Sequence, residues 1–255
     1  MTFHLPDLSG NLLVYLLVFS RAGAMIMLLP AIGDQGVPSR VRLVLALAVS
    51  VALAPVVAHE YPQGGPENSF ALGLLIAKEI TSGVLIGAMA RIIMSALSVA
   101  GYLIATQIGL AYAQSIDPSM GGENVVVGNF LTLLGTVLVF ATNLHHLAIG
   151  AIEGSYTLIP PGAPLPTADM AELAIRLVGS SFALGLQLSA PFLVFGFAVS
   201  AAIGLLARLM PQMQVFFVAM PINLLLGFFL MMLLIGSMMT VFLHYYATEM
   251  ARFMS

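Results

Sequence analysis

Six long apolar stretches occupy most of the sequence, and they constrain the fold more than any other feature. They cover residues 12–29, 41–58, 70–113, 125–152, 173–207 and 215–243. Most exceed the ~20 residues that a membrane-spanning helix needs. They are continuously apolar rather than alternating, so they favour helices over the short strands of a membrane barrel. The sequence predicts an all-α, polytopic helical membrane protein with long, broken helices and helical hairpins.

Two of these stretches, residues 70–113 and 173–207, are too long for a simple span. A continuous helix over residues 70–113 would be roughly 65 Å long at about 1.5 Å per residue, or about twice the hydrocarbon thickness of a bilayer. Such a segment breaks, folds back or leaves the lipid, and it is tolerable where other subunits cover it. We therefore expect a subunit of a larger assembly. No soluble domain or internal repeat is evident, so residues 1–255 are predicted to form a single unit.

Composition excludes several functional classes. Only 7% of the 255 residues are charged and the net charge is -3, so no basic surface is present to bind nucleic acid. Cysteine is absent, which rules out a disulfide framework, a thiolate nucleophile and a cysteine-ligated metal. Lys and Arg are absent before the first apolar stretch, so we expect that stretch to be retained as a helix rather than removed as a signal peptide.

The charged residues inside apolar stretches include Arg21, Lys78, Glu79 and Arg91. A charge at the centre of a bilayer costs a few kcal/mol or more, so such residues are expected to have a functional or paired role in assembly. Lys78 and Glu79 are adjacent and point to different faces of a helix, so we expect their partners on another helix or subunit. The alternative is that these side chains extend to the membrane interface.

Small residues mark faces where a helix can approach closely. Gly83 and Gly87 form a Gly-x-x-x-Gly pair, and Gly196, Ser200 and Gly204 form a ladder along one helix face. We predict that these faces pack against a neighbouring helix, within the chain or from a partner. The pattern indicates packing and is silent on function.

No pattern in the sequence predicts an enzyme or a metal site. His145 and His146 are adjacent, so they face different ways, and the His-Glu-x-x-His spacing of a zinc site is absent. A serine hydrolase elbow, Gly-x-Ser-x-Gly, is absent as well. We expect a histidine pair at a helix end that bonds backbone or partner groups, no metal and no cofactor.

A polar break at residues 101–122 is the most suggestive stretch for function. Thr106, Gln107, Tyr112, Gln114 and Ser115 interrupt the apolar pattern, which ends at Asp117-Pro118 and a glycine pair. Such a break is tolerated in a membrane only where it lines a cavity or is buried by protein. It is therefore a candidate pore element, with a simple connecting loop as the alternative.

The order of motifs along the chain resembles the FliR family of flagellar export-gate proteins and their type III secretion counterparts. The resemblance covers nearly the whole chain. It is carried by Arg21, Pro30, Pro38, Arg42 and Pro55, by residues 109–118, by Asn143, Leu144, His145 and His146, by Ser155, Tyr156 and Pro160, and by residues 208–212 with Pro221.

This resemblance implies a non-enzymatic subunit that assembles with FliP and FliQ into an export gate. The gate would lie in the bacterial inner membrane at the flagellar basal body, with FlhB and FlhA as further partners, membrane lipid around it and exported flagellar proteins as substrates. Residues 1–172 would form a FliP-like portion and residues 173–255 a FliQ-like hairpin. The family's pore plug maps onto Gly109, Leu110, Tyr112, Gln114, Ser115, Ile116, Asp117 and Pro118, with Ser115 in place of a second aromatic residue.

Two other functional classes remain open on sequence grounds. A small-solute secondary transporter also has broken helices and buried charges, but it would favour internal repeats. An intramembrane enzyme lacks any recognisable constellation of catalytic residues. Co-purification with FliP and FliQ would favour the export gate, whereas a monomer that binds a small solute would favour the transporter.

Overall fold

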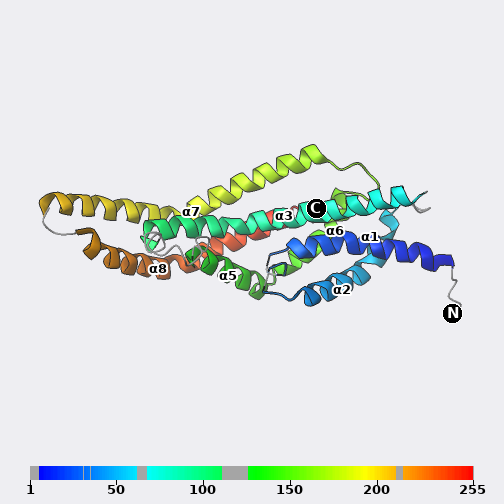
Figure 1. The fold of residues 1–255 in the computed structure, drawn as a ribbon, viewed down its shortest axis with the longest axis horizontal. Coiled ribbons are helices and arrows are strands. Elements are labelled where there is room, and N and C mark those ends of the chain that lie inside the picture. Colours follow the sequence, from blue (N-terminus) through cyan, green and yellow to red (C-terminus); the bar gives the residue numbers. More distant parts are fainter. Residues whose placement is uncertain are drawn as a thin grey trace. The chain divides into compact units, whose positions relative to one another are not determined.

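The computed structural model describes residues 6–30, 32–34, 36–61, 68–110, 126–210 and 215–254. Every regular element in these ranges is a helix, which confirms the all-α prediction (Figure 1). In chain order they are α1 (Pro6–Leu28), α2 (Ser39–Val57), the short 3-10 helix η1 (Ala58–Glu60), α3 (Ser69–Gln107), α5 (Val126–Ala141), α6 (His145–Leu158), α7 (Thr167–Leu209) and α8 (Val215–Ala251).

The ends of the helices follow local backbone chemistry. Pro38 directly precedes α2, where its fixed φ and missing N–H are compatible with a helix start. Beyond α3, Gly109 adopts φ +85°, a left-handed conformation that glycine enters without the steric penalty of a side chain. Asn143, with φ 60°, lies at the break between α5 and α6, which bend by 79°. The 125–152 stretch is therefore broken, whereas α3 runs unbroken for 39 residues.

The helices are long and apolar enough for a multi-pass membrane protein. Four of the described helical segments qualify by length and hydropathy: Ser39–Glu60, Ser69–Gln107, Thr167–Leu209 and Ala219–Ala251. The bent pair of α5 and α6 adds a fifth if it crosses as one broken span. The apolar part of α1, Leu12–Leu28, is shorter.

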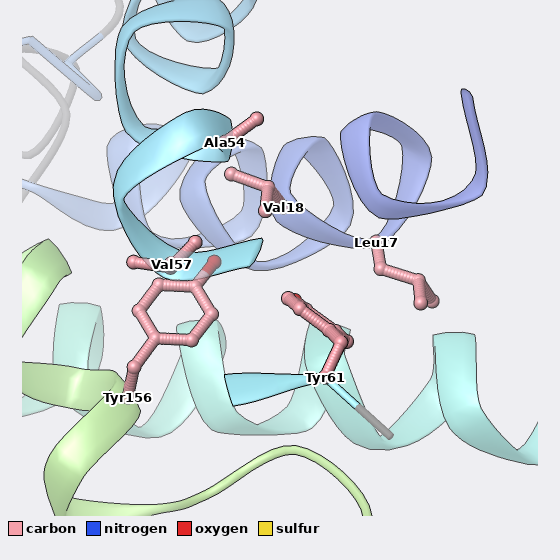
Figure 2. Packing of buried hydrophobic residues seen from close by; sticks show 6 residues of the cluster. All are labelled: Leu17, Val18, Ala54, Val57, Tyr61 and Tyr156. Carbon is pink, nitrogen blue, oxygen red and sulfur yellow. The ribbon is translucent and has the colours of Figure 1, made fainter. Parts of the chain in front are cut away.

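The chain divides into two compact units, of which the first comprises Met1–Ile93, Phe140–Leu177 and Ala247–Ser255. Its core includes a buried cluster from α1, α2, α6 and the residue after η1 (Figure 2). The cluster consists of Leu17, Val18, Ala54, Val57, Tyr61 and Tyr156. These residues bring the start of the chain and α6 to one place, although more than 100 residues separate them in sequence.

The second unit comprises Met94–Val139 and Val178–Tyr246. Its helices approach closely at glycines: a Cβ on Gly101 would overlap the backbone of Gly128, and a Cβ on Gly185 would lie 3.0 Å from the Ala96 carbonyl oxygen. The Tyr245 hydroxyl lies 2.9 Å from both Ser180 Oγ and Ser181 Oγ, which joins α7 to α8. Small residues and short polar contacts thus hold this unit together.

Candidate functional site

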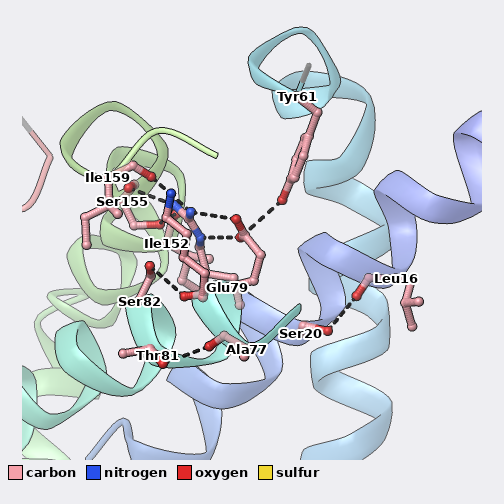
Figure 3. A network of polar contacts seen from close by, with 12 residues as sticks. Leu16, Ser20, Tyr61, Ala77, Glu79, Thr81, Ser82, Ile152, Ser155 and Ile159 are labelled. Carbon is pink, nitrogen blue, oxygen red and sulfur yellow. Dashed lines mark hydrogen bonds and ion pairs between the residues drawn. The ribbon is translucent and has the colours of Figure 1, made fainter. Parts of the chain in front are cut away.

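The first unit contains a fully buried ion pair between α1 and α3. Arg21 donates from Nε to Glu79 Oε2 at 2.6 Å and from Nη2 to Glu79 Oε1 at 3.0 Å. Both side chains have 0% exposure. The paired geometry matches the fork of a guanidinium to the two oxygens of a carboxylate, which is the strongest arrangement for such a pair. Figure 3 shows the polar network around Glu79.

Arg21 also binds the C-terminal end of α6. Its Nη1 donates to the Ser155 carbonyl oxygen at 2.9 Å, and its Nη2 donates to the Ile159 carbonyl oxygen at 3.0 Å. Carbonyl groups at a helix C-terminus carry partial negative charge, so a cation is favourable there. The Tyr156 ring lies 4.2 Å from the guanidinium carbon and adds a cation–π contact.

Tyr61 completes the coordination of Glu79 from the chain that follows η1. Its hydroxyl donates to Glu79 Oε2 at 3.3 Å, and its ring meets the Tyr156 ring edge-on at 6.2 Å between centroids. Burial raises the pKa of the Tyr61 phenol, and Tyr156 and the Glu79 carboxylate raise it further. Tyr61 therefore remains protonated at neutral pH and acts as a donor.

We call Arg21, Glu79, Tyr61, Ser155, Tyr156 and Ile159 the ion-pair centre. Each N–H of the guanidinium has an acceptor in it, counting a longer contact of 3.4 Å from Nη1 to Ser155 Oγ. The physical consequence of this centre is to tie α1, α3, α6 and the end of η1 to one another.

Arg91 and Lys78 behave differently. Arg91 Nη2 lies 3.2 Å from Asp34 Oδ1, and about half of each side chain is exposed. Lys78 is half-buried and forms no ion pair with any carboxylate among the described residues. The sequence indicated that Lys78 and Glu79 would not pair with each other, and in the structure Glu79 pairs with Arg21.

The small residues singled out from the sequence are placed in different surroundings. A Cβ on Gly83 would overlap the Arg21 carbonyl oxygen, and a Cβ on Gly87 would lie 2.8 Å from Leu28 Cβ, so both glycines lie directly against α1. Gly196 lies against the Gln107 side chain. Ser200 is exposed, and a Cβ on Gly204 would meet no described atom within 4 Å.

The end of α3 is held by α8 in the second unit. Asn223 Nδ2 donates to the Gln107 carbonyl oxygen at 3.2 Å, and Ile108, with 0% exposure, lies against Gly227. Gly109 and Leu110, the first two residues of the proposed plug, follow directly. The other six, Tyr112, Gln114, Ser115, Ile116, Asp117 and Pro118, lie outside the described residues.

The histidine pair lies at the start of α6. The His145 ring stacks on Phe140 at 5.0 Å between centroids, and the His146 ring is 4.3 Å from His145. Within the described ranges, no group of three or more His, Cys, Asp or Glu residues is arranged to hold a metal ion. Aromatic packing next to the α5–α6 bend accounts for the position of His145.

Comparison with known proteins identifies the family. Residues 12–248 match the family described as "Bacterial export proteins, family 1". The flagellar biosynthetic protein FliR of Caulobacter vibrioides is 44% identical over 227 residues, which are 88% of this chain and 89% of that protein. The chain belongs to the FliR family of bacterial export proteins.

Further members of the family span both export systems. The flagellar biosynthetic protein FliR of Escherichia coli is 30% identical over 83% of this chain and 80% of its own length. The Yop proteins translocation protein T of Yersinia pestis is 30% identical over 83% of this chain and 82% of its own length. The resemblance to the FliR family inferred from sequence motifs is confirmed.

The ion-pair centre unites FliR-family motifs that lie far apart in the sequence. Arg21 comes from the first motif and Ser155-Tyr156 from a motif 134 residues later, and the two are joined by a hydrogen bond. Sequence reasoning missed Tyr61 and Ile159 as partners in this centre. Nothing in the sequence marks them, because one contributes a hydroxyl from a connector and the other only a backbone carbonyl.

Proposed function

We propose that this chain is a non-enzymatic core subunit of the flagellar protein-export gate. The observation that carries the proposal is the 44% identity to a flagellar FliR over 88% of the chain, compared with 30% to the Yersinia translocation protein. In this proposal the chain lies in the inner membrane at the flagellar basal body. It assembles with FliP and FliQ, next to FlhA and FlhB, and exported flagellar proteins pass through the gate.

The distribution of apolar surface supports a subunit that is covered by other proteins. In the second unit, α7 and α8 expose many large apolar side chains, including Phe197 at 77%, Leu225 at 73% and Met232 at 77%. Apolar faces of this extent need either lipid or partner helices. At about 1.5 Å per residue, the 43 residues of α7 measure about 65 Å, far more than a bilayer requires, which favours protein partners over part of that length.

Two finer features belong to the same proposal. Residues 1–172 form a FliP-like portion and residues 173–255 a FliQ-like hairpin, in keeping with two long helices that follow one another at the C-terminal end. Residues 109–118 close the resting channel. The polar interruption of an apolar stretch and the resemblance of this segment to the family's plug support that role.

Deletion and complementation in the native host test the proposal. Cells that lack the gene should be non-motile and should not release flagellar proteins into the medium, and the wild-type gene on a plasmid should restore both. A deletion strain that swims and exports flagellar proteins normally would contradict the flagellar role. Normal motility together with a loss of secreted virulence proteins would assign the chain to the other export system.

A further inference from the structure

We propose that the outer face of α3 around Lys78 docks a membrane helix of a neighbouring subunit that carries a carboxylate opposite Lys78. The proposal deepens the proposed function, because it names the chemistry of one contact that this subunit makes in the gate. It is carried by two observations: a positive charge beside the ion-pair centre that forms no ion pair within the described part of the chain, and an exposed apolar face next to that charge.

Among the residues that the structure describes, the charges around the ion-pair centre do not balance. Arg21 and Lys78 are both cations, and Glu79 is the carboxylate of the centre. Both oxygens of Glu79 are occupied by Arg21 Nε and Nη2, and Tyr61 donates to one of them as well. Glu79 thus makes its hydrogen bonds with Arg21 and Tyr61, and a second carboxylate is needed to balance the two cations.

The face next to Lys78 is apolar and open. Its exposed members recur at spacings of three and four residues, which places them on one side of α3. They include Phe70 at 81% exposure, Leu74 at 64%, Ile80 at 42% and Val84 at 41%. Ala77 and Thr81 are exposed on the same side and are small, so the backbone of a second helix can approach there.

The position of Lys78 along α3 indicates a protein carboxylate rather than a lipid headgroup. A headgroup lies at the membrane surface, whereas Lys78 is preceded by nine uncharged residues of α3 and followed, after Glu79, by eleven more. Any continuous window of about 20 residues in α3, the length of a span, contains Lys78 or Arg91. Arg91 has Asp34 as its partner, whereas Lys78 has no carboxylate partner among the described residues, and in this proposal a neighbouring subunit supplies one.

The test measures assembly of the full-length chain co-expressed with the other gate subunits. Lys78→Met should reduce the fraction of tagged chain recovered in the assembled gate by about tenfold or more, because the partner's carboxylate would then be buried alone. Lys78→Arg should retain assembly. Arg176→Met is the matched control, since Arg176 is an exposed cation already paired with Glu172 in its own helix. The level of each variant in the membrane reports whether it folds.

A second measurement identifies the partner helix. The chain has no cysteine, so Ala77→Cys or Thr81→Cys provides a single cross-linking site. Cross-links should form to a membrane helix of another subunit, within one turn of an Asp or Glu, and changing that residue to Lys should restore assembly of Lys78→Glu.

The outcomes separate this inference from the proposed function. If the wild-type chain assembles and Lys78→Met assembles equally well, the inference about Lys78 fails while the proposed function stands. If Lys78→Met assembles normally but loses a co-purified acidic lipid, a lipid is the ligand and the inference is overturned. If the wild-type chain recovers no gate subunit, the proposed function itself fails.

Discussion

Neutralising Glu79 should destabilise the first unit more than any exposed charge change in the chain. Glu79→Gln keeps the shape of the side chain but removes its charge. Arg21 would then be a buried cation whose Nε and Nη2 face an uncharged amide, while its bonds to the Ser155 and Ile159 carbonyl oxygens remain. Breaking one side of a buried ion pair costs about 3–5 kcal/mol, so we expect a loss of that size.

The double substitution Arg21→Met with Glu79→Gln separates the cost of an unpaired charge from the value of the pair, and its amide oxygen still accepts from the Tyr61 hydroxyl. Removing both charges leaves no buried ion. The Ser155 carbonyl oxygen still accepts from the Ile159 N–H at 3.0 Å, but the Ile159 carbonyl oxygen loses its Arg21 donor. One unsatisfied buried carbonyl costs about 1–3 kcal/mol. The double variant should therefore be less destabilised than Glu79→Gln alone.

Hydrogen–deuterium exchange of the assembled protein in lipid nanodiscs measures these differences. A loss of about 3–5 kcal/mol corresponds to opening that is roughly 100-fold to several thousand-fold more frequent at the amides of α1 and α6. Arg176→Gln is the control, because its pair with Glu172 is exposed and such pairs contribute at most about 1 kcal/mol. Exchange in Glu79→Gln that matches this control, or a double variant worse than the single one, would refute the reasoning.

Three further outcomes are expected. Gly83→Ala should lower the thermal stability of the gate, because the new Cβ would overlap a carbonyl oxygen of α1. Gly179→Ala in α7 meets open space and should be neutral or stabilising by up to about 1 kcal/mol. The raised pKa of Tyr61 stabilises the fold at neutral pH, and this contribution should be lost as pH rises above about 10, the usual pKa of tyrosine. Tyr61→Phe should flatten that part of a stability–pH curve, and an unchanged curve would contradict the assignment. Deleting residues 112–115 should leave the gate assembled while raising membrane conductance, and an assembled but tight membrane would make the segment a simple connector.

The helical fold was predictable because its signal is spread over long continuous stretches. Apolar runs of 18 residues or more have few alternatives in a membrane, so the helices follow from composition and length. The break between α5 and α6 near Asn143 was not predicted, because residues 125–152 form one continuous apolar stretch in the sequence. The unbroken course of α3 to Gln107 was less evident. Glycine and proline mark where a helix can end, but Gly83 and Gly87 lie inside α3 because close contact with α1 requires them there.

The ion-pair centre was predictable only in part. An arginine and a glutamate inside apolar stretches indicate that each needs a partner, but 58 residues separate Arg21 from Glu79, and several pairings were compatible with the sequence. The pairing of Arg21 with Glu79 is set by the packing of α3 on α1. At Gly83 the two helices are so close that the Arg21 backbone lies directly against α3. Tyr61 and the Ile159 carbonyl carry no signal of their own, because hydroxyl and backbone groups become ligands only through tertiary structure.

Purification of the tagged full-length chain from membranes of its native host tests the central claim most directly. Mass spectrometry of the purified material should identify FliP and FliQ in a single complex with the chain, and the complex should persist through size-exclusion chromatography in detergent. Recovery of the chain as a stable, monodisperse monomer that binds a small solute and carries neither subunit would contradict the account and favour a secondary transporter.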